Sequence, residues 1–600
     1  MRVDLRLVCW ALVALWRLAP AAASGADHEA AGQGLKTLLD DMWEYRLEED
    51  PLFATSVGDH RFNDRLPKVS PADSQRRHEQ DGKFSARLAE IDRAGLSAAD
   101  QVNYDILARE LREDMAEFKF QSHLTPITHR SGFHVEFPEL RRETPLATVK
   151  DCENYIARLR AFDQYAAGNI ELLRAGIAAE QTLPAAILGG YEPTINAHIV
   201  ADPEESLLYE PFQKLPSSIP GGEHGRLRAA ARAAISEGVV AGYRRFQAFM
   251  RDEYVPRARG SISASALPEG RDFYRHRIRR FTTLEMTPDE VHQRGLSEVH
   301  RIRQEMEAII RRVKFEGNFA AFVEHLRTDP RFYAESPEEL LQEASFILKK
   351  MDGELPSLFG RLPRMPYGIR PVPDYVAPRT TAAYYQRPTG DGTRAGFYNL
   401  NTYNLKARPL FALEALSLHE AVPGHHLQIA LQQELEDLPN FRRYAGATAF
   451  VEGWALYAER LGLETGFYQD PYSDFGRLSM EMWRACRLVV DTGIHYFDWP
   501  RPRAIEFLRE NSAQSLHNIE AEVDRYIGWP GQAVAYKTGE LKIRELRALA
   551  EKELGDRFDV RAFHDAVLGG GAVPLDVLDA SIRAWIDAER ARDDGDANPG

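Results

Sequence analysis

The chain has 600 residues, 44% of them hydrophobic and 28% charged, and this balance excludes a wholly disordered protein. Its formal net charge of −15 argues against nucleic acid as the main partner, because nucleic-acid-binding proteins usually present a basic face. Beyond the N-terminus, no segment reaches the roughly 20 apolar residues of a membrane-spanning helix, so no membrane span is expected.

The first 26 residues have the pattern of an export signal. Arg2 and Arg6 precede an apolar stretch at residues 7–16, and small residues at 21–26 offer a cleavage site to signal peptidase. A retained N-terminal helix is the alternative, since charged residues interrupt the pattern. We therefore expect a periplasmic or secreted protein.

Removal of this signal would leave two cysteines in the mature chain, Cys152 and Cys486. They could form one disulfide in an oxidising compartment, or they could stay apart as small buried hydrophobic residues. The sequence leaves both possibilities open.

The rest of the chain is expected to be mainly helical. Several helix starts carry a hydroxyl side chain at the cap and an acid three residues later, at Ser97, Thr287 and Ser336. A chain of this length is too long for a single hydrophobic core, and a loop with three serines and a proline spans residues 261–270. We divide the mature chain into an N-terminal helical lobe at 27–260, a C-terminal helical lobe with the metal site at 261–589, and a flexible tail at 590–600.

Two short strands are predicted in an otherwise helical sequence. Residues 382–386 and 396–401 flank a turn at 388–392, so we expect a small β-hairpin or short sheet near the site described next. The strand at 396–401, which contains Tyr398, could offer a backbone edge and a side chain to an extended peptide. Alternatively, the hairpin only supports the neighbouring helix.

The strongest motif is Leu-His-Glu-Ala-Val-Pro-Gly-His-His, at residues 418–426. In the common zinc-protease motif, two histidines lie four residues apart on one helix. Here that position is Pro423, which cannot bind a metal, and the next histidines lie about 9 and 10.5 Å further along an unbroken helix. A bulge at Pro423 and Gly424 would return His425 to the ligand position. We favour His425 over His426, which would orient a ligand or touch substrate.

A third ligand is required, because catalytic zinc has three protein ligands and an open position. Glu452 lies in an apolar helical segment, where an unpaired carboxylate would be costly to bury. The glycine after it allows another backbone to approach closely, and we expect the motif helix there. Glu459 is two helical turns away and could hydrogen-bond a ligating histidine.

This pattern resembles a known family. His-Glu-x-x-Pro-Gly-His followed by Glu-Gly-Trp-Ala-x-Tyr is similar to the bacterial domain of unknown function 885, which looks like a distant relative of zincin metallopeptidases. The resemblance extends over most of the mature chain. It implies a mainly helical fold with a deep central channel, zinc ligands at His419, His425 and Glu452, and Glu420 as general base.

Other residues could support hydrolysis. The developing oxyanion needs a donor, for which Tyr536 is the first candidate and His495 the second. Each could instead be a core residue with a satisfied polar group. Arg484 and Arg487 could bind a substrate carboxylate, or pair with surface acids.

We expect a zinc-dependent hydrolase, a metallopeptidase that cleaves short peptides through a metal-activated water. A zinc amidase acting on a non-peptide amide would use the same chemistry. A binding protein without activity is the third possibility, although a structural zinc has no use for a base such as Glu420.

Overall fold

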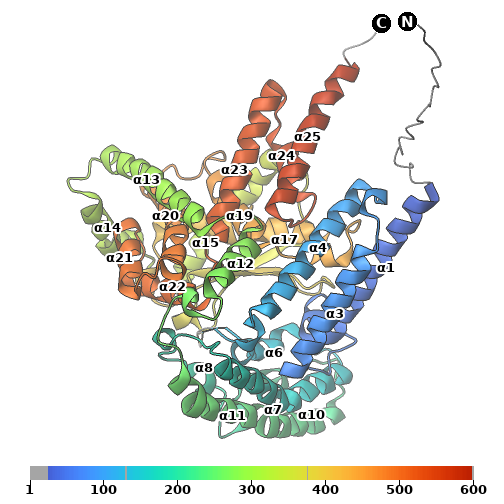
Figure 1. The fold of residues 1–600 in the computed structure, drawn as a ribbon. Helices are drawn as coiled ribbons and strands as arrows, with labels where there is room; N and C mark the ends of the chain where they lie inside the picture. Colours follow the sequence, from blue (N-terminus) through green and yellow to red (C-terminus); the bar gives the residue numbers. More distant parts are fainter. Residues whose placement is uncertain (1–24, 129–130, 375, 597–600) are drawn as a thin grey trace, which may run out of the picture.

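The structure, a computed structural model, describes residues 25–128, 131–374 and 376–596, and is mainly helical (Figure 1). The predicted export signal lies almost entirely outside the described residues. No helix among the described residues is long and apolar enough to cross a membrane.

The first half of the chain forms one side and the base of the molecule in Figure 1. Its long helices α1, α3 and α4 stand together, and α7, α10 and α11 form the base. The α-helices of this half are α1 Gly25–Glu49, α2 Pro51–Ser56, α3 Pro71–Ala89, α4 Ala98–Lys119, α5 Phe133–Glu136, α6 Leu140–Glu143, α7 Val149–Ala178, α8 Pro193–Asn196, α9 Glu210–Gln213, α10 Gly221–Ala234 and α11 Ala241–Phe249.

The second half contains the motif helices and their neighbours. Within it, α13 packs along α20, and α19 packs along α23. Its α-helices are α12 Gly270–Thr282, α13 Pro288–Arg312, α14 Phe319–Thr328, α15 Pro337–Leu358, α16 Leu413–Glu420, α17 His425–Gln433, α18 Asn440–Arg443, α19 Thr448–Leu461, α20 Pro471–His495, α21 Arg501–Asn511, α22 Leu516–Gly528, α23 Ala535–Leu554, α24 Val560–Leu568 and α25 Leu575–Asp596.

The predicted helix starts are confirmed with their capping chemistry. The hydroxyl of Ser97 accepts from the backbone N–H three residues later, and Ser336 does the same. Thr287 forms a full capping box, in which Glu290 also binds the backbone N–H of the cap. At the other end of the chain, α25 continues to Asp596, so residues 590–596 of the expected flexible tail are helical.

The small sheet has three strands, one more than the sequence predicts. β3 (Gly396–Leu400) lies in the middle, parallel to β1 (Tyr367–Pro371) and antiparallel to β2 (Ala383–Gln386). β1 lies in a proline-rich segment, which local sequence would favour as a loop. It tolerates its proline because Pro371 ends an outer strand. β3 is thus paired on both sides, and the prediction that it offers a free edge to a peptide is wrong.

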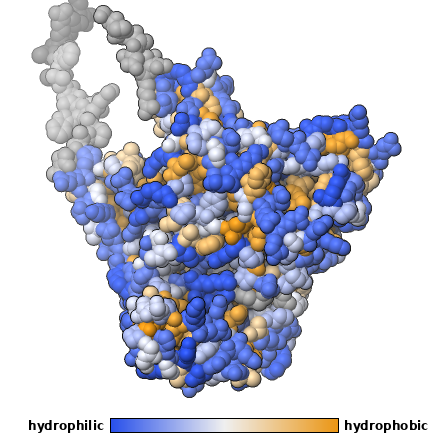
Figure 2. Space-filling view, turned by 180° about the vertical axis from the view of Figure 1, so that it is seen from behind, coloured by the Kyte–Doolittle hydropathy of each residue, from blue (hydrophilic) through white to orange (hydrophobic). Residues whose placement is uncertain are grey.

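One large hydrophobic cluster runs from Leu35 in α1 to Ile586 in α25, so both predicted lobes contribute to it. Cys152 and Cys486 are free and fully buried within this cluster, which resolves the open question of a disulfide. Hydrophilic residues cover most of the face in Figure 2, with hydrophobic residues scattered between them. The shared core fixes the second-half helices against the first half.

Candidate metal centre

The motif does not form one kinked helix; the chain leaves the helix at the motif. α16 ends at Glu420 and α17 begins at His425, with a four-residue turn between them. The turn folds tightly onto the end of α16, since a Cβ on Gly424 would lie 2.0 Å from the carbonyl oxygen of His419. The indole of Trp454 also donates to the carbonyl of Pro423 (2.9 Å). The break therefore starts a new helix with His425 beside His419.

His419, His425 and Glu452 converge. One ligand atom from each lies within 4.8 Å of the others. Oε2 of Glu452 is 3.7 Å from Nε2 of His419 and 3.5 Å from Nε2 of His425. The three side chains predicted as metal ligands thus meet at one place in the fold.

The charge state of this cluster reflects its mutual contacts. Burial alone would lower the pKa of His419, but contacts with Glu452 and with Glu459 raise it to about 9. Burial would conversely raise the pKa of Glu452, and the two histidines hold it well below its usual value. The carboxylate and the imidazoles therefore stabilise each other electrostatically.

Glu459 orients the first histidine. Its Oε1 lies 2.8 Å from Nδ1 of His419, and both side chains are buried. This bond leaves Nε2 of His419 to face Glu452. Metal-ligating histidines are commonly held this way by a carboxylate on the other ring nitrogen.

The helix that carries Glu452 is held by a close helix contact. A Cβ on Gly453 would lie 2.5 Å from Cα of Gly539 in α23. A Cβ on Gly539 would lie only 1.7 Å from the carbonyl oxygen of Ala449. The backbone that approaches Gly453 is therefore α23, and the expectation that the motif helix approaches there is wrong.

His426 faces away from the cluster. Its Nε2 lies 3.0 Å from the carbonyl oxygen of Met365, so this nitrogen carries the proton. Its Nδ1 is then the acceptor for the hydroxyl of Tyr385 in β2, at 2.9 Å. Burial lowers the pKa of His426 to about 4. His426 thus fixes β2 and the segment before β1, and it contacts neither Glu452 nor a shared ligand position.

The cluster lines a pocket of about 340 Å³ that gathers several of the predicted residues. Glu420 and Tyr536 line it with the three candidate ligands, as do Arg484 and Arg487. Two further lining residues, Glu522 and Arg525 of α22, were missed by sequence reasoning. A signal for Glu522 exists, because helical spacing places it in the apolar stripe of Ile519, Val523 and Tyr526.

Two predicted site residues do not reach this pocket. Tyr398 is fully buried behind α16, and its hydroxyl has no partner within hydrogen-bond geometry among the described residues, although Ser417 lies near it. His495 is also fully buried, with its ring nitrogens 3.1 Å from the backbone N of Ala264 and 2.9 Å from the carbonyl oxygen of Tyr526. Neither side chain lines the pocket, because both are packed in the core and the two ring nitrogens of His495 are hydrogen-bonded to backbone atoms.

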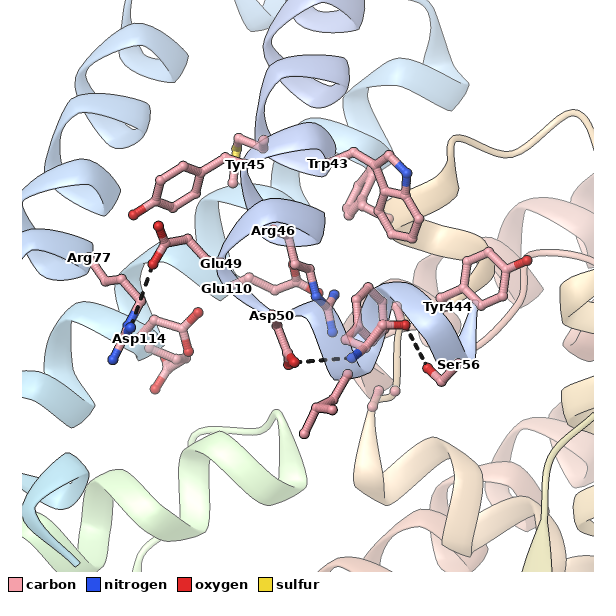
Figure 3. Close-up of a pocket in the computed structure, with 18 of the residues that line it drawn as sticks. Trp43, Tyr45, Arg46, Glu49, Asp50, Ser56, Arg77, Glu110, Asp114 and Tyr444 are labelled. Atoms are coloured by element: carbon pink, nitrogen blue, oxygen red, sulfur yellow. Dashed lines mark hydrogen bonds and ion pairs between the residues drawn. The ribbon is translucent and has the colours of Figure 1, made fainter. Parts of the chain in front are cut away.

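A larger cavity, of about 1240 Å³, adjoins the metal pocket. Tyr384 and Tyr385 of β2 line both. Figure 3 shows Arg46 near the middle of this cavity, with Glu110 and Asp114 to one side and the ring pair of Trp43 and Tyr444 to the other. The deep central channel stays a prediction, and the structure shows a large cavity with many acidic residues that reaches β2, beside the cluster of His419, His425 and Glu452.

Comparison with known proteins identifies the family. A model of the family described as bacterial protein of unknown function (DUF885) matches residues 51–582. A search of curated proteins gave no match. The crystal structure of a candidate lipoprotein from Colwellia psychrerythraea is similar, with a TM-score of 0.88, 31% identity, and 93% of this chain and 99% of that chain covered.

A second solved structure shares the fold. It is a candidate lipoprotein of unknown function from Shewanella oneidensis, with a TM-score of 0.65, 18% identity and the same coverage of both chains, 93% and 99%. With the family model matching nearly the whole described chain, the protein belongs to the DUF885 family of bacterial proteins of unknown function.

Proposed function

We propose that this protein is a zinc-dependent hydrolase of the metallopeptidase type that cleaves short peptides. The single observation that carries the proposal is the convergence of His419, His425 and Glu452 in a pocket that also contains Glu420. Two imidazoles and one carboxylate are a ligand set of catalytic zinc, which leaves one position open.

The donor set fits zinc. Ligands at 2.0 to 2.1 Å from a tetrahedral ion lie about 3.4 Å apart, close to the 3.5 and 3.7 Å between Glu452 and the histidines. The bond from His419 to Glu459 supplies the supporting contact that such histidines need. Bound zinc would supply Lewis acidity, which lowers the pKa of water and polarises a substrate carbonyl.

Two side chains then have roles in proton transfer and charge stabilisation. Glu420, the residue after the first ligand, takes a proton from the attacking water and delivers it to the amine that leaves. The hydroxyl of Tyr536 can donate a hydrogen bond to the substrate oxygen that gains negative charge, since Tyr536 lines the same pocket. The scissile C–N bond breaks. The oxygen of water becomes part of the new carboxylate, and its proton goes to the amine.

The substrate class follows from the surroundings of the cluster. β2 is an outer strand among the described residues and lines both cavities, so its backbone edge can bind an extended peptide without selecting for sequence. The lipoprotein descriptions of both structural relatives support a site of action outside the cytoplasm. A hydrolase of short peptides in the periplasm or outside the cell fits these features.

Metal analysis combined with hydrolysis of a mixed peptide library tests the proposal. The purified protein is expected to hold one zinc per chain and to cleave peptides. Glu420→Gln should retain zinc and lose at least ~100-fold in kcat, while Glu307→Gln, an exposed residue of α13, should match the wild type. Zinc without cleavage of any peptide would refute peptidase activity, and full activity of Glu420→Gln would refute the role of the base.

A further inference from the structure

One wall of the metal pocket is basic. Arg484 and Arg487 of α20 and Arg525 of α22 line the pocket that contains the three candidate ligands. All three side chains are buried, with residue exposures of 3%, 3% and 6%. Guanidinium groups are seldom buried unless they are paired, so their partners determine what this wall can bind.

Several neighbours hold the guanidinium of Arg487 in place, but they bind only two of its three nitrogens. Its Nη2 donates to Glu522 (2.9 Å) and its Nε to the hydroxyl of Tyr526 (3.0 Å). The same group lies 4.3 Å from the ring of Trp483 and 4.4 Å from that of Tyr536. Its Nη1 has no hydrogen-bond acceptor in the part of the chain that the structure describes. A buried donor without an acceptor carries a cost, which a bound ligand can remove.

Arg525 shows the same incomplete pairing. Its Nη1 donates to Gln532 (3.1 Å), and Nε lies 3.3 Å from the carboxylate of Glu522 but outside hydrogen-bond geometry. Where the chain is described, its Nε and Nη2 have no acceptor within hydrogen-bond geometry, although, against the effect of burial, Glu522 and the neighbouring Tyr536 raise the pKa of Arg525. Among the described residues, Arg487 and Arg525 form ion pairs with one carboxylate only, that of Glu522. Two guanidinium groups facing one carboxylate leave one positive charge in excess, next to the metal cluster.

The neighbouring cavity, unlike the arginine wall, is acidic. Nine carboxylate side chains and five cationic ones line it. Figure 3 shows several of them, including Glu49, Glu110 and Asp114 on one side. β2 separates this acidic cavity from the metal pocket, because Tyr384 and Tyr385 line both. A peptide lying along β2 would therefore meet positive charge at one end and negative charge at the other.

We propose that Arg487 and Arg525 bind the free C-terminal carboxylate of the peptide substrate, so that the enzyme removes residues from the carboxyl end. This inference rests on the proposed function and specifies its substrate. A planar guanidinium with free N–H donors matches a carboxylate bidentately. The amino-terminal part of the peptide then extends past β2 into the acidic cavity, where carboxylates favour its ammonium group.

The size of the pocket limits the product. About 340 Å³ is at the low end for small-molecule sites, so a short C-terminal fragment fits between the arginines and the metal cluster. Hydrolysis adds water across one peptide bond: the oxygen joins the carbonyl carbon, and the leaving amine takes a proton. The products are a shortened peptide and a free amino acid or dipeptide.

Binding of N-acetyl-trialanine and of its C-terminal amide to the zinc-loaded Glu420→Gln protein tests the carboxylate subsite without requiring turnover. Isothermal titration should show ~10- to 100-fold tighter binding of the acid, because charge-assisted hydrogen bonds are lost with the amide. Adding Arg525→Gln should bring the two affinities close together. Adding Arg509→Gln, an exposed arginine of α21, should change neither.

Hydrolysis of the same peptides by the wild type separates the two proposals. Release of C-terminal residues from the acid, identified by mass, supports both. Equal binding and equal cleavage of acid and amide would overturn the carboxylate subsite and leave the hydrolase intact. Preferential binding of the acid with no cleavage would support the subsite and overturn hydrolysis. If Arg525→Gln fails to fold, the same comparison of acid with amide on the metal-free protein separates binding at the arginines from binding of the carboxylate to zinc; equal binding there would overturn the subsite.

Discussion

The Nδ1 atom of His419 lies 2.8 Å from Oε1 of Glu459, a residue forty positions further along the chain. This contact joins α16 to α19, the two helices that supply the first histidine and the carboxylate of the cluster. It fixes the orientation of the imidazole and directs Nε2 toward Glu452. The candidate metal centre therefore depends on the packing of these helices as well as on the spacing of the motif.

Replacing Glu459 should weaken metal binding without removing a ligand. In Glu459→Gln the uncharged amide supports His419 less strongly, and zinc affinity is expected to fall ~10- to 100-fold. Competition with a chromophoric chelator measures this affinity. Glu464→Gln, at the surface just after α19, is the matched control and should bind zinc normally. Unchanged affinity in Glu459→Gln would show that the contact does not support the ligand.

The two adjacent histidines should differ sharply when each is replaced. His425→Ala removes a candidate ligand and is expected to abolish stoichiometric zinc binding. His426→Ala leaves the cluster intact but releases the hydroxyl of Tyr385 and the carbonyl of Met365, at a cost of about 1 to 3 kcal/mol in unfolding free energy. Zinc titration and urea denaturation of both variants test this. Loss of zinc in His426→Ala alone would reverse the assignment.

The contact between α19 and α23 should not tolerate a larger residue. In Gly453→Ala, the new methyl group would lie 2.5 Å from Cα of Gly539, which is backbone and cannot rotate aside. We expect a loss of ~1 to 3 kcal/mol in unfolding free energy and weaker zinc binding, because Glu452 is adjacent. In the control Gly353→Ala, no atom lies within 4 Å of the added carbon. Gly353→Ala should raise the unfolding free energy by about 0.5 to 1 kcal/mol, because alanine favours a helix over glycine. Equal stabilities would contradict the close packing.

A buried histidine behind α19 should make stability depend on pH. Nδ1 of His564 lies 2.8 Å from the carbonyl oxygen of Leu358, and Nε2 accepts from the hydroxyl of Tyr457 (2.9 Å). Burial lowers the pKa of His564 to about 3, from 6.5. The contribution of neutral His564 to the unfolding free energy is thus complete above pH 6.5. It is lost as pH falls below 6.5, because the unfolded chain then takes up a proton that the folded chain does not.

Between pH 7.5 and 5.0 this one residue should remove ~2 kcal/mol of stability. Glutamine cannot take up a proton, so the unfolding free energy of His564→Gln should fall by ~2 kcal/mol less than that of the wild type over the same pH range. The other buried histidines contribute equally to both proteins. Denaturant unfolding at the two pH values gives the difference. An identical pH dependence in both proteins would contradict a neutral buried His564.

The sequence could predict the three converging side chains because their pattern is local. His419 and His425 could be brought together if the helix was interrupted at Pro423, and Glu452 stood out as an acid in an apolar helix. The form of that interruption was not predictable, since the turn depends on contacts from Trp454. β1 was missed because its prolines are typical of loops, and a parallel partner cannot be read from local sequence.

Other features depend on which helices are neighbours. The position after Glu452 indicated a close backbone approach, but nothing local showed that α23 supplies it. Arg525 was missed because a charged residue on a helix is usually at the surface, and its partner Glu522 lies one turn before it. His495 was proposed for catalysis from its place in an apolar segment, which equally describes a core histidine with satisfied nitrogens.

Anomalous diffraction at the zinc absorption edge from crystals of the full chain tests the central claim most directly. We predict one strong peak, about 2.0 to 2.2 Å from Nε2 of His419, Nε2 of His425 and the carboxylate of Glu452. Crystals of the His425→Ala protein should lack it. Absence of the peak from zinc-supplied wild-type crystals, or its position on other residues, would contradict the metal centre and the hydrolase built on it.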